Sequence, residues 1–331
     1  MKKYQIYGIG AALVDTEFVV TDAFLSTHKI DKGLMTLVDE ERQFHLIKAL
    51  NSHSHNVERS CGGSACNSIV AASSFGSKTF YSGKVADDDD GRFFVKDLQA
   101  TGVEFHNEEA RSGVTGKCLV MVTDDAERTM NTFLGANLGL TSNEVDELAL
   151  INSDWLYLEG YLATDDSRTA VAVKAIECAK ANLVKTSISL SDPFVVQVFG
   201  DNLNKVIGDC VDLLFCNSDE ARSFTKTHNT EAAAEQLKKY AKTFVITCGA
   251  GGSLSYDGID LIQTPGVVAN AVDTNGAGDM FAGAFLYAIN SGHSYGWAAK
   301  FANAASSIVV SQFGPRIGKI EYDQLKQQFN I

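Results

Sequence analysis

The chain contains little proline and no stretch that looks like a linker. Only 3 of its 331 residues are proline, and no low-complexity segment interrupts the sequence. Segments of biased composition are typical of flexible connections, so nothing in the composition separates the chain into tethered parts. A chain of this length can bury a sizeable core, and it fits one large α/β domain with an appendage as well as it fits two domains.

The cysteine content excludes a disulfide framework. There are 7 cysteines, an odd number at irregular spacing. Cys61 and Cys66 are the closest pair, yet there is no second such pair and no histidine at ligand spacing, which argues against a zinc site. We therefore expect a reduced, cytoplasmic protein.

Long hydrophobic runs and an excess of positive charge are absent as well. No segment approaches the roughly twenty apolar residues that cross a bilayer, and the first apolar stretch is too short and too interrupted for a signal peptide. The formal net charge of −13 argues against a nucleic-acid or anionic-membrane partner, because neither is attracted to a surface of that sign. An anionic substrate would need a local positive pocket built from amides, a metal or a few basic residues.

Much of the chemistry that the sequence does contain lies in the run from Asp273 to Asp279, which reads DTNGAGD. It stands between a strand-like segment at 266–272 and an expected helix at 280–290. The backbone amides before this helix favour an anion, because unpaired N–H groups and the helix dipole point at one spot. A carboxylate in the first turn is then a candidate general base. The alternative is a loop that ends in a helix cap, where the carboxylate only complements the dipole. The amides belong to Gly276, Ala277 and Gly278, and the carboxylate to Asp279.

A second glycine motif precedes an expected helix at 65–75. Gly62 and Gly63 allow backbone to approach a ligand closely, and Asn67, one turn into the helix, offers both a donor and an acceptor. The alternative is a tight turn from strand to helix in which Asn67 caps its own backbone.

The N-terminal region does not form a dinucleotide-binding fingerprint. A buried strand at 4–9 leads into glycines, but Leu13 occupies the third glycine position and a strand, not a helix, follows at 11–20. We expect this strand to leave the main sheet and to pair with 35–38. Alternating segments at 114–123 and 128–134 predict a hairpin in the same small sheet, which would act as a lid that excludes water from a phosphoryl transfer.

From Trp155 onward, apolar strands alternate with amphipathic helices. This pattern predicts a largely parallel sheet that is covered on both faces, with ligands beyond the carboxyl ends of the strands. Asn217 and Glu220 follow one such strand, where a carboxylate can organise the waters of a phosphate-bound Mg²⁺; a helix cap followed by helix-start acids is the alternative. Glycines after the next strand suit contact with a nucleotide, without the Gly-Lys-Ser/Thr ending of a Walker A loop. That site comprises Thr247, Gly249 and Gly252.

These motifs, in this order and at these distances, resemble the ribokinase (PfkB) family of carbohydrate and nucleoside kinases. The resemblance covers essentially the whole chain. It implies a three-layer α/β/α fold with a mostly parallel central sheet and a small β-sheet lid. The expected large α/β domain comprises 1–10, 39–112 and 135–331, and the expected lid comprises 11–38 and 113–134. The implied activity is ATP-dependent transfer of the γ-phosphoryl group to a sugar hydroxyl, since positioning and charge neutralisation are most of what this transfer requires.

The resemblance also implies roles for individual residues. Gly62, Gly63 and Asn67 hold the hydroxyls of the acceptor sugar. Asp279 takes the hydroxyl proton, the neighbouring glycine-rich amides form the anion hole, and Mg²⁺ is organised from the side of Asn217 and Glu220, with Glu220 acting through water. The nucleotide lies against the glycine loop and a helix that carries Asn303. A K⁺ ion beside the anion hole, near Asp273, is a property of some members and stays open for this chain.

Two segments resemble bacterial adenosine-kinase-like members. Asp15 corresponds to the aspartate that binds ribose hydroxyls, and Arg128 to the arginine that neutralises phosphate as the lid closes; a solvated hairpin residue is the alternative for Arg128. Ala11 stands where adenosine kinases usually have asparagine, which puts the acceptor in doubt. The expected function is therefore phosphorylation of a nucleoside, adenosine to AMP at the 5′-hydroxyl, with a free-sugar kinase as the alternative and a non-catalytic sensor as a third. The sequence does not decide between a monomer and a homodimer.

Overall fold

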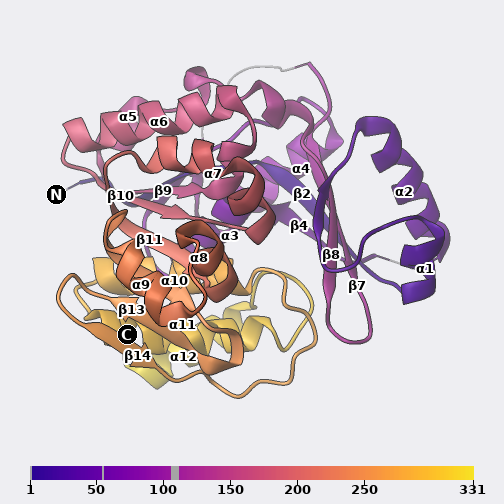
Figure 1. The fold of residues 1–331 in the computed structure, drawn as a ribbon. Helices are drawn as coiled ribbons and strands as arrows, with labels where there is room; N and C mark the ends of the chain where they lie inside the picture. The colour runs from indigo at the N-terminus through magenta and orange to yellow at the C-terminus, as the bar shows by residue number, and fades with distance from the viewer. Residues whose placement is uncertain (1, 54–55, 106–111) are drawn as a thin grey trace.

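A nine-stranded sheet runs through the larger part of the molecule (Figure 1). The computed structural model describes residues 2–53, 56–105 and 112–331. Within them the strand order is β14-β13-β12-β11-β10-β9-β1-β5-β6, and every neighbouring pair from β12 to β6 is parallel. The two strands beyond β12 form an antiparallel hairpin. The strands are β1 Tyr4–Ile9, β5 Thr79–Ser82, β6 Glu104–Phe105, β9 Ser153–Glu159, β10 Lys185–Ser189, β11 Val211–Asn217, β12 Ala241–Thr247, β13 Ser253–Tyr256 and β14 Leu261–Thr264.

Helices cover both faces of this sheet, which confirms the predicted three-layer α/β/α arrangement. Successive strand residues enter opposite layers: Ile6 packs into the core of one face and Tyr7 into the core of the other. One layer contains α3 Ser64–Phe75, α4 Asp89–Ala100, α10 Ala277–Asn290, α11 Tyr295–Val309 and α12 Lys319–Phe329. The other contains α5 Glu147–Ile151, α6 Asp166–Ala181, α7 Pro193–Ile207, α8 Ser218–Thr225 and α9 Thr230–Leu237. Short 3₁₀ turns occur at η1 Gly135–Gly139, η2 Ser142–Glu144, η3 Gly160–Thr164 and η4 Gly249–Gly251.

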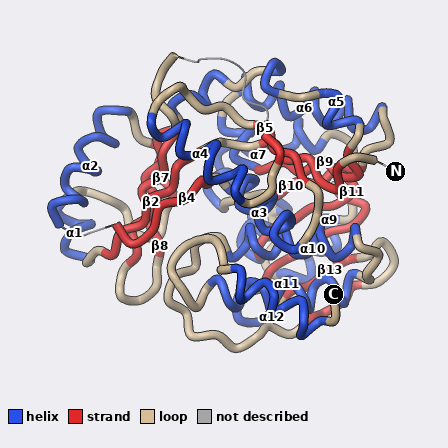
Figure 2. Tube along the Cα trace, turned by 180° about the vertical axis from the view of Figure 1, so that it is seen from behind, coloured by secondary structure: helices blue, strands red, loops and turns tan. Residues whose placement is uncertain are grey.

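A five-stranded sheet stands at one end of the larger one, as Figures 1 and 2 both show. Its outer face is covered by α1 Asp22–Thr27 and α2 Glu40–His53, through buried side chains such as Phe24 and Leu46. Its inner face faces the carboxyl ends of the large sheet across a cavity. The strand order is β3-β8-β7-β2-β4, with β2 Leu13–Val19, β3 Met35–Leu37, β4 Asn56–Gly62, β7 Gly116–Val122 and β8 Arg128–Phe133.

The pairing inside the small sheet corrects one prediction and extends another. β3 pairs with β8, not with β2, because the β7–β8 hairpin places β7 against β2 and leaves only the far edge of β8 free. The other edge of β2 pairs with β4, which lies within the range 39–112 that was predicted to belong to the large domain. The range 39–112 therefore includes β4 and α2, which pack with the small sheet, and its residues 54–55 and 106–111 lie outside the described part.

The segment 266–272 is not a strand. The large sheet ends at β14, and the amide of Val272 donates to the carbonyl of Val310, at the end of α11, instead of joining a ladder. The predicted strand was wrong because an apolar run can be held by a helix end as well as by a neighbouring strand.

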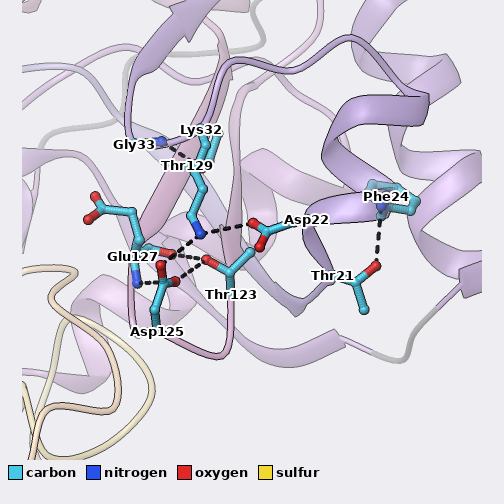
Figure 3. Close-up of polar contacts among 9 residues, drawn as sticks. All are labelled: Thr21, Asp22, Phe24, Lys32, Gly33, Thr123, Asp125, Glu127 and Thr129. Carbon is cyan, nitrogen blue, oxygen red and sulfur yellow. Dashed lines mark hydrogen bonds and ion pairs between the residues drawn. The ribbon is translucent and has the colours of Figure 1, made fainter.

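A lysine joins the segment after α1 to the tip of the β7–β8 hairpin (Figure 3). Lys32 Nζ lies 2.8 Å from Asp22 Oδ1 and 2.8 Å from Asp125 Oδ2. The amide of Gly33 donates to Thr129 Oγ1 at 3.0 Å. Partly exposed ion pairs contribute only about 0–1 kcal/mol, so these contacts fix the relative placement of the two segments more than they stabilise the fold.

Candidate active site

Asp279 lies in the first turn of α10 and is held by two side chains from the start of α3. Ser64 Oγ donates to Asp279 Oδ1 at 2.6 Å, and Asn67 Nδ2 donates to Asp279 Oδ2 at 3.1 Å. Burial raises the pKa of Asp279, while these two hydrogen bonds oppose the shift. A positioned carboxylate of raised pKa is suited to accept a proton near neutral pH.

The loop before Asp279 depends on glycine for its shape. Gly276 has φ of 71°, in the left-handed region, and a Cβ built there would lie 2.4 Å from Pro315 Cβ. Asp273 holds this loop from behind, because its carboxylate accepts from the amides of Asn275 at 2.9 Å and Gly314 at 3.1 Å. The amides at the start of α10 then open on a cavity, which residues 274–279 line.

That cavity has a volume of about 280 Å³ and lies between the small sheet and the carboxyl ends of the large one. The cavity is lined by residues of the predicted acceptor site, the lid, the predicted Mg²⁺ site and the predicted anion hole. The predicted site residues that line it are Asp15, Gly63, Asn67, Arg128, Asn217, Glu220, Thr247, Gly276, Ala277, Gly278 and Asp279. Four others do not line it: Gly62, Gly249, Gly252 and Asn303.

Asp15 sits against the glycine turn that precedes α3. A Cβ at Gly62 would lie 2.1 Å from the Asp15 carboxyl carbon, so Gly62 serves the site by leaving room for this side chain. Gly63, at φ of 98°, donates its amide to Asp15. Burial raises the pKa of Asp15 to about 7, and the positive charge of Arg316 opposes the rise.

Glu159 is a buried carboxylate that the sequence analysis missed. It ends β9, and its two oxygens accept from the amides of Ala11 and Ala65, both at 2.7 Å. Burial raises the pKa of Glu159 to about 7. It lines the same cavity, and its place after a predicted strand at 155–158 was the available signal, because polar residues at carboxyl ends of parallel strands gather at one edge.

Arg128 connects the small sheet to the glycine-rich loop. Its Nη1 donates to Asn275 Oδ1 at 3.3 Å, and Asn275 Nδ2 donates to Glu17 Oε1 at 3.0 Å. Arg128 thus faces the cavity beside the predicted anion hole. The contribution of Asn275 was also missed, although the residue stands within the predicted motif.

Asn217 and Glu220 form a reciprocal helix cap and also line the cavity. Glu220 Oε1 accepts from Asn217 Nδ2 at 2.7 Å, and the Asn217 side chain accepts from the amide of Glu220 at 2.8 Å. Burial raises the pKa of Glu220 to about 7. Capping does not exhaust the carboxylate oxygens, so the cap and a role toward a metal are compatible.

The described part of the chain contains no group of three or more His, Cys, Asp or Glu side chains that could hold a metal ion. A single buried carboxylate fits Mg²⁺ that is bound mainly by phosphates and water, as this ion usually is at phosphoryl-transfer sites. Glu220 lines the cavity and would orient such waters, and the charge that Mg²⁺ supplies would neutralise phosphate.

Three residues that were predicted to bind the nucleotide do not line the cavity, and each has a different structural setting. Gly249 has φ of 54° with open space where a Cβ would point. A Cβ at Gly252 would lie 2.1 Å from the carbonyl oxygen of Thr264, so this glycine lets the β13–β14 hairpin return. Asn303 Nδ2 donates to Ser253 Oγ at 3.2 Å and to the carbonyl of Pro265 at 3.2 Å, which fixes the loop after β14.

A cavity at the carboxyl ends of a parallel sheet, with a positioned carboxylate beside helix-start amides, is suited to phosphoryl transfer. The model of pfkB family carbohydrate kinases matches residues 27–321. The chain belongs to this family and is a sugar or nucleoside kinase, which implies ATP as the phosphoryl donor and Mg²⁺ as its metal.

The similar proteins differ in the acceptors that their names give. Adenosine kinase 2 of Arabidopsis thaliana is 29% identical over 330 residues, which cover 93% of this chain and 94% of that protein. The 5-dehydro-2-deoxygluconokinase of Halalkalibacterium halodurans is 30% identical over 264 residues, which cover 76% of this chain and 80% of that protein. The crystal structure of adenosine kinase from Sinorhizobium meliloti has a TM-score of 0.92 and 33% identity, and covers 98% of this chain and 99% of that one.

Across the described ranges, no helix combines the length and apolar character that a membrane span requires.

Proposed function

We propose that the protein is an ATP- and Mg²⁺-dependent nucleoside kinase that phosphorylates the 5′-hydroxyl of adenosine to give AMP. The observation that carries this proposal is the apolar wall that the small sheet and its flanking residues present to the cavity. The wall consists of Ala11, Leu13, Met35, Leu37, Met130 and Leu134. A flat nucleobase can bury its faces against such side chains, whereas a free sugar would leave hydroxyls unpaired there.

The polar end of the cavity suits the ribose of the same acceptor. The Asp15 carboxylate can accept from two neighbouring hydroxyls, and Asn67 Nδ2 already points at Asp279. A 5′-hydroxyl beside Asp279 would give its proton to the Asp279 carboxylate as its oxygen forms a bond to the γ-phosphorus. The bond from that phosphorus to the β,γ-bridging oxygen breaks, and ADP leaves with the electron pair.

The anion hole and Arg128 act on the phosphoryl group in this proposal. Gly276, Ala277 and Gly278 supply amides where negative charge is carried, and the Arg128 guanidinium lies across the loop from them. The small sheet serves as the lid that keeps water from competing as acceptor.

A free-sugar kinase is the second candidate. Ala11 offers no polar side chain to the acceptor, and one similar protein is named 5-dehydro-2-deoxygluconokinase. Release of ADP should be measured with adenosine, inosine, guanosine, ribose, fructose and 5-dehydro-2-deoxygluconate at equal concentrations. We expect the highest kcat/KM with adenosine; turnover of free sugars with none on nucleosides would overturn the nucleoside proposal.

A further inference from the structure

Arg316 is a largely buried arginine that the reaction described above does not use. Its side chain is 14% exposed. Nη1 donates to Asp97 Oδ2 at 2.9 Å, and Nη2 donates to the carbonyl oxygen of Cys61 and lies 2.6 Å from Cys61 Sγ. One guanidinium therefore joins three parts of the chain: the end of β4, helix α4 and the segment after α11.

Arg316 binds β4 at Cys61, directly before the turn formed by Gly62 and Gly63. We call this turn the acceptor turn. β4 is an edge strand, so the outward N–H and C=O of Cys61 have no neighbouring strand. Asp97 Oδ2 accepts from the Cys61 amide at 2.8 Å, and Arg316 occupies the carbonyl. The two side chains replace the missing strand at the residue that leads into Gly62 and Gly63.

The backbone beside Arg316 contacts the glycine-rich loop on the phosphoryl side. The amide of Gly314 donates to Asp273 Oδ2 at 3.1 Å, and Pro315 packs where a Cβ at Gly276 would stand. Three consecutive residues, 314–316, thus contact the anion-hole loop at one end and the acceptor turn at the other. The distance between the two loops is set through this segment.

The positive charge of Arg316 also acts on Asp15. This charge lowers the pKa of Asp15, against burial and the negative charges of Asp279 and Glu159, which raise it. Two thiols and a phenol on the surrounding elements also interact with Asp15. They are Cys118 of β7, Cys66 of α3 and Tyr81 of β5.

We infer that Arg316 is a positioning residue of this kinase: it holds the turn at Gly62 and Gly63 in register with the anion hole. The inference rests on the proposed nucleoside kinase function for its readout. It assigns to Arg316 two separable properties, the forked geometry and the positive charge.

Two substitutions separate these properties. Arg316→Lys keeps the charge and loses the fork, whereas Arg316→Gln loses both. Both should lower kcat by at least roughly 10-fold, because a small misplacement of the reacting groups is costly for phosphoryl transfer. Arg92→Gln, at an exposed arginine of α4, is the control and should leave kcat unchanged.

The pH dependence of kcat/KM for the acceptor tests the charge. Ionised Asp15 is the binding form, so kcat/KM rises with pH through about 7 and then levels off. Removal of a nearby positive charge raises the pKa of a carboxyl group, so Arg316→Gln should move this rise upward by about one pH unit. Arg316→Lys should leave it in place. In Asp15→Asn the rise should be smaller but still present, because Asp279, the proposed base, also titrates.

Kinetics that match the wild type, with only a lower melting temperature, would show a purely structural role and overturn the inference. An unshifted pH rise in Arg316→Gln would overturn the role of the charge. If Arg316→Gln does not fold, Asp97→Asn provides a second test of the geometry. This variant weakens the contact with Cys61 while Arg316 remains in place. An unchanged kcat in both Asp97→Asn and Arg316→Lys would then overturn the inference. The wild-type enzyme is assayed before any variant. If it turns over no nucleoside, the proposed function is wrong, and this outcome is distinct from a failure of the inference about Arg316.

Discussion

The proposed acceptor half and the proposed nucleotide half of the active site are built in different ways. In the acceptor half, buried and half-buried side chains hold one another or the backbone: Asp279 accepts from Ser64 and Asn67, and Glu159 accepts from two backbone amides. In the nucleotide half, which comprises Thr247, Gly249 and Gly252, a Cβ at Gly249 would face open space. The acceptor half is therefore formed before a ligand arrives, whereas the nucleotide half offers mostly backbone and open surface.

This difference indicates where selectivity and tolerance lie. A buried network loses much when one partner is removed, because the remaining polar groups are left unpaired. A backbone site on an exposed loop keeps its N–H groups when a side chain changes. We expect substitutions in the acceptor half to have the larger effects.

The largest effect is expected for Asp279→Asn. The amide cannot take the hydroxyl proton, so kcat should fall by roughly 10²- to 10⁴-fold, the usual contribution of a general base. Isothermal titration with adenosine should show a similar Kd, since the base acts in the transition state. A variant that retains most of its kcat would show that Asp279 is not the base.

An intermediate effect is expected for Glu220→Gln, at the boundary of the two halves. The change removes a charge that would orient waters of Mg²⁺, so the Mg²⁺ concentration for half-maximal rate should rise by roughly 10-fold, as for other residues behind a metal. Glu220 also caps α8, so a matched Asn229→Ala variant, which removes the cap of α9, controls for the loss of a helix cap. An unchanged Mg²⁺ dependence would restrict Glu220 to capping.

The smallest effect is expected for Gly249→Ala. The new Cβ meets no atom within 4 Å, so the main cost is the left-handed backbone, about 1 kcal/mol. The KM for ATP should change by only a few fold in steady-state assays. Gly252→Ala is the contrast, because its Cβ would collide with the Thr264 carbonyl and should lower the melting temperature strongly. A large kinetic defect in Gly249→Ala with normal stability would mean that the nucleotide half is as exacting as the acceptor half.

Local patterns predicted much of the fold and of the site. The helix at the DTNGAGD run begins at Ala277, and the hairpin at 114–134 forms β7 and β8. The pairing of β3 and the membership of β4 could not be predicted in this way, because a strand's neighbours depend on which edges other segments leave free. Glu159 was missed because its partners are amides at Ala11 and Ala65, which no short motif contains.

The sequence by itself determined the local requirements of this protein. The residue at the left-handed backbone position 276 is glycine, and Asp279 lies in the first turn of the helix that follows. Only the tertiary structure decided what these residues face, because burial and charge depend on contacts between distant segments. Arg316 is the clearest case: it reaches Asp97 across 219 residues and Cys61 across 255, so its effect on Asp15 exists only once the layers have packed.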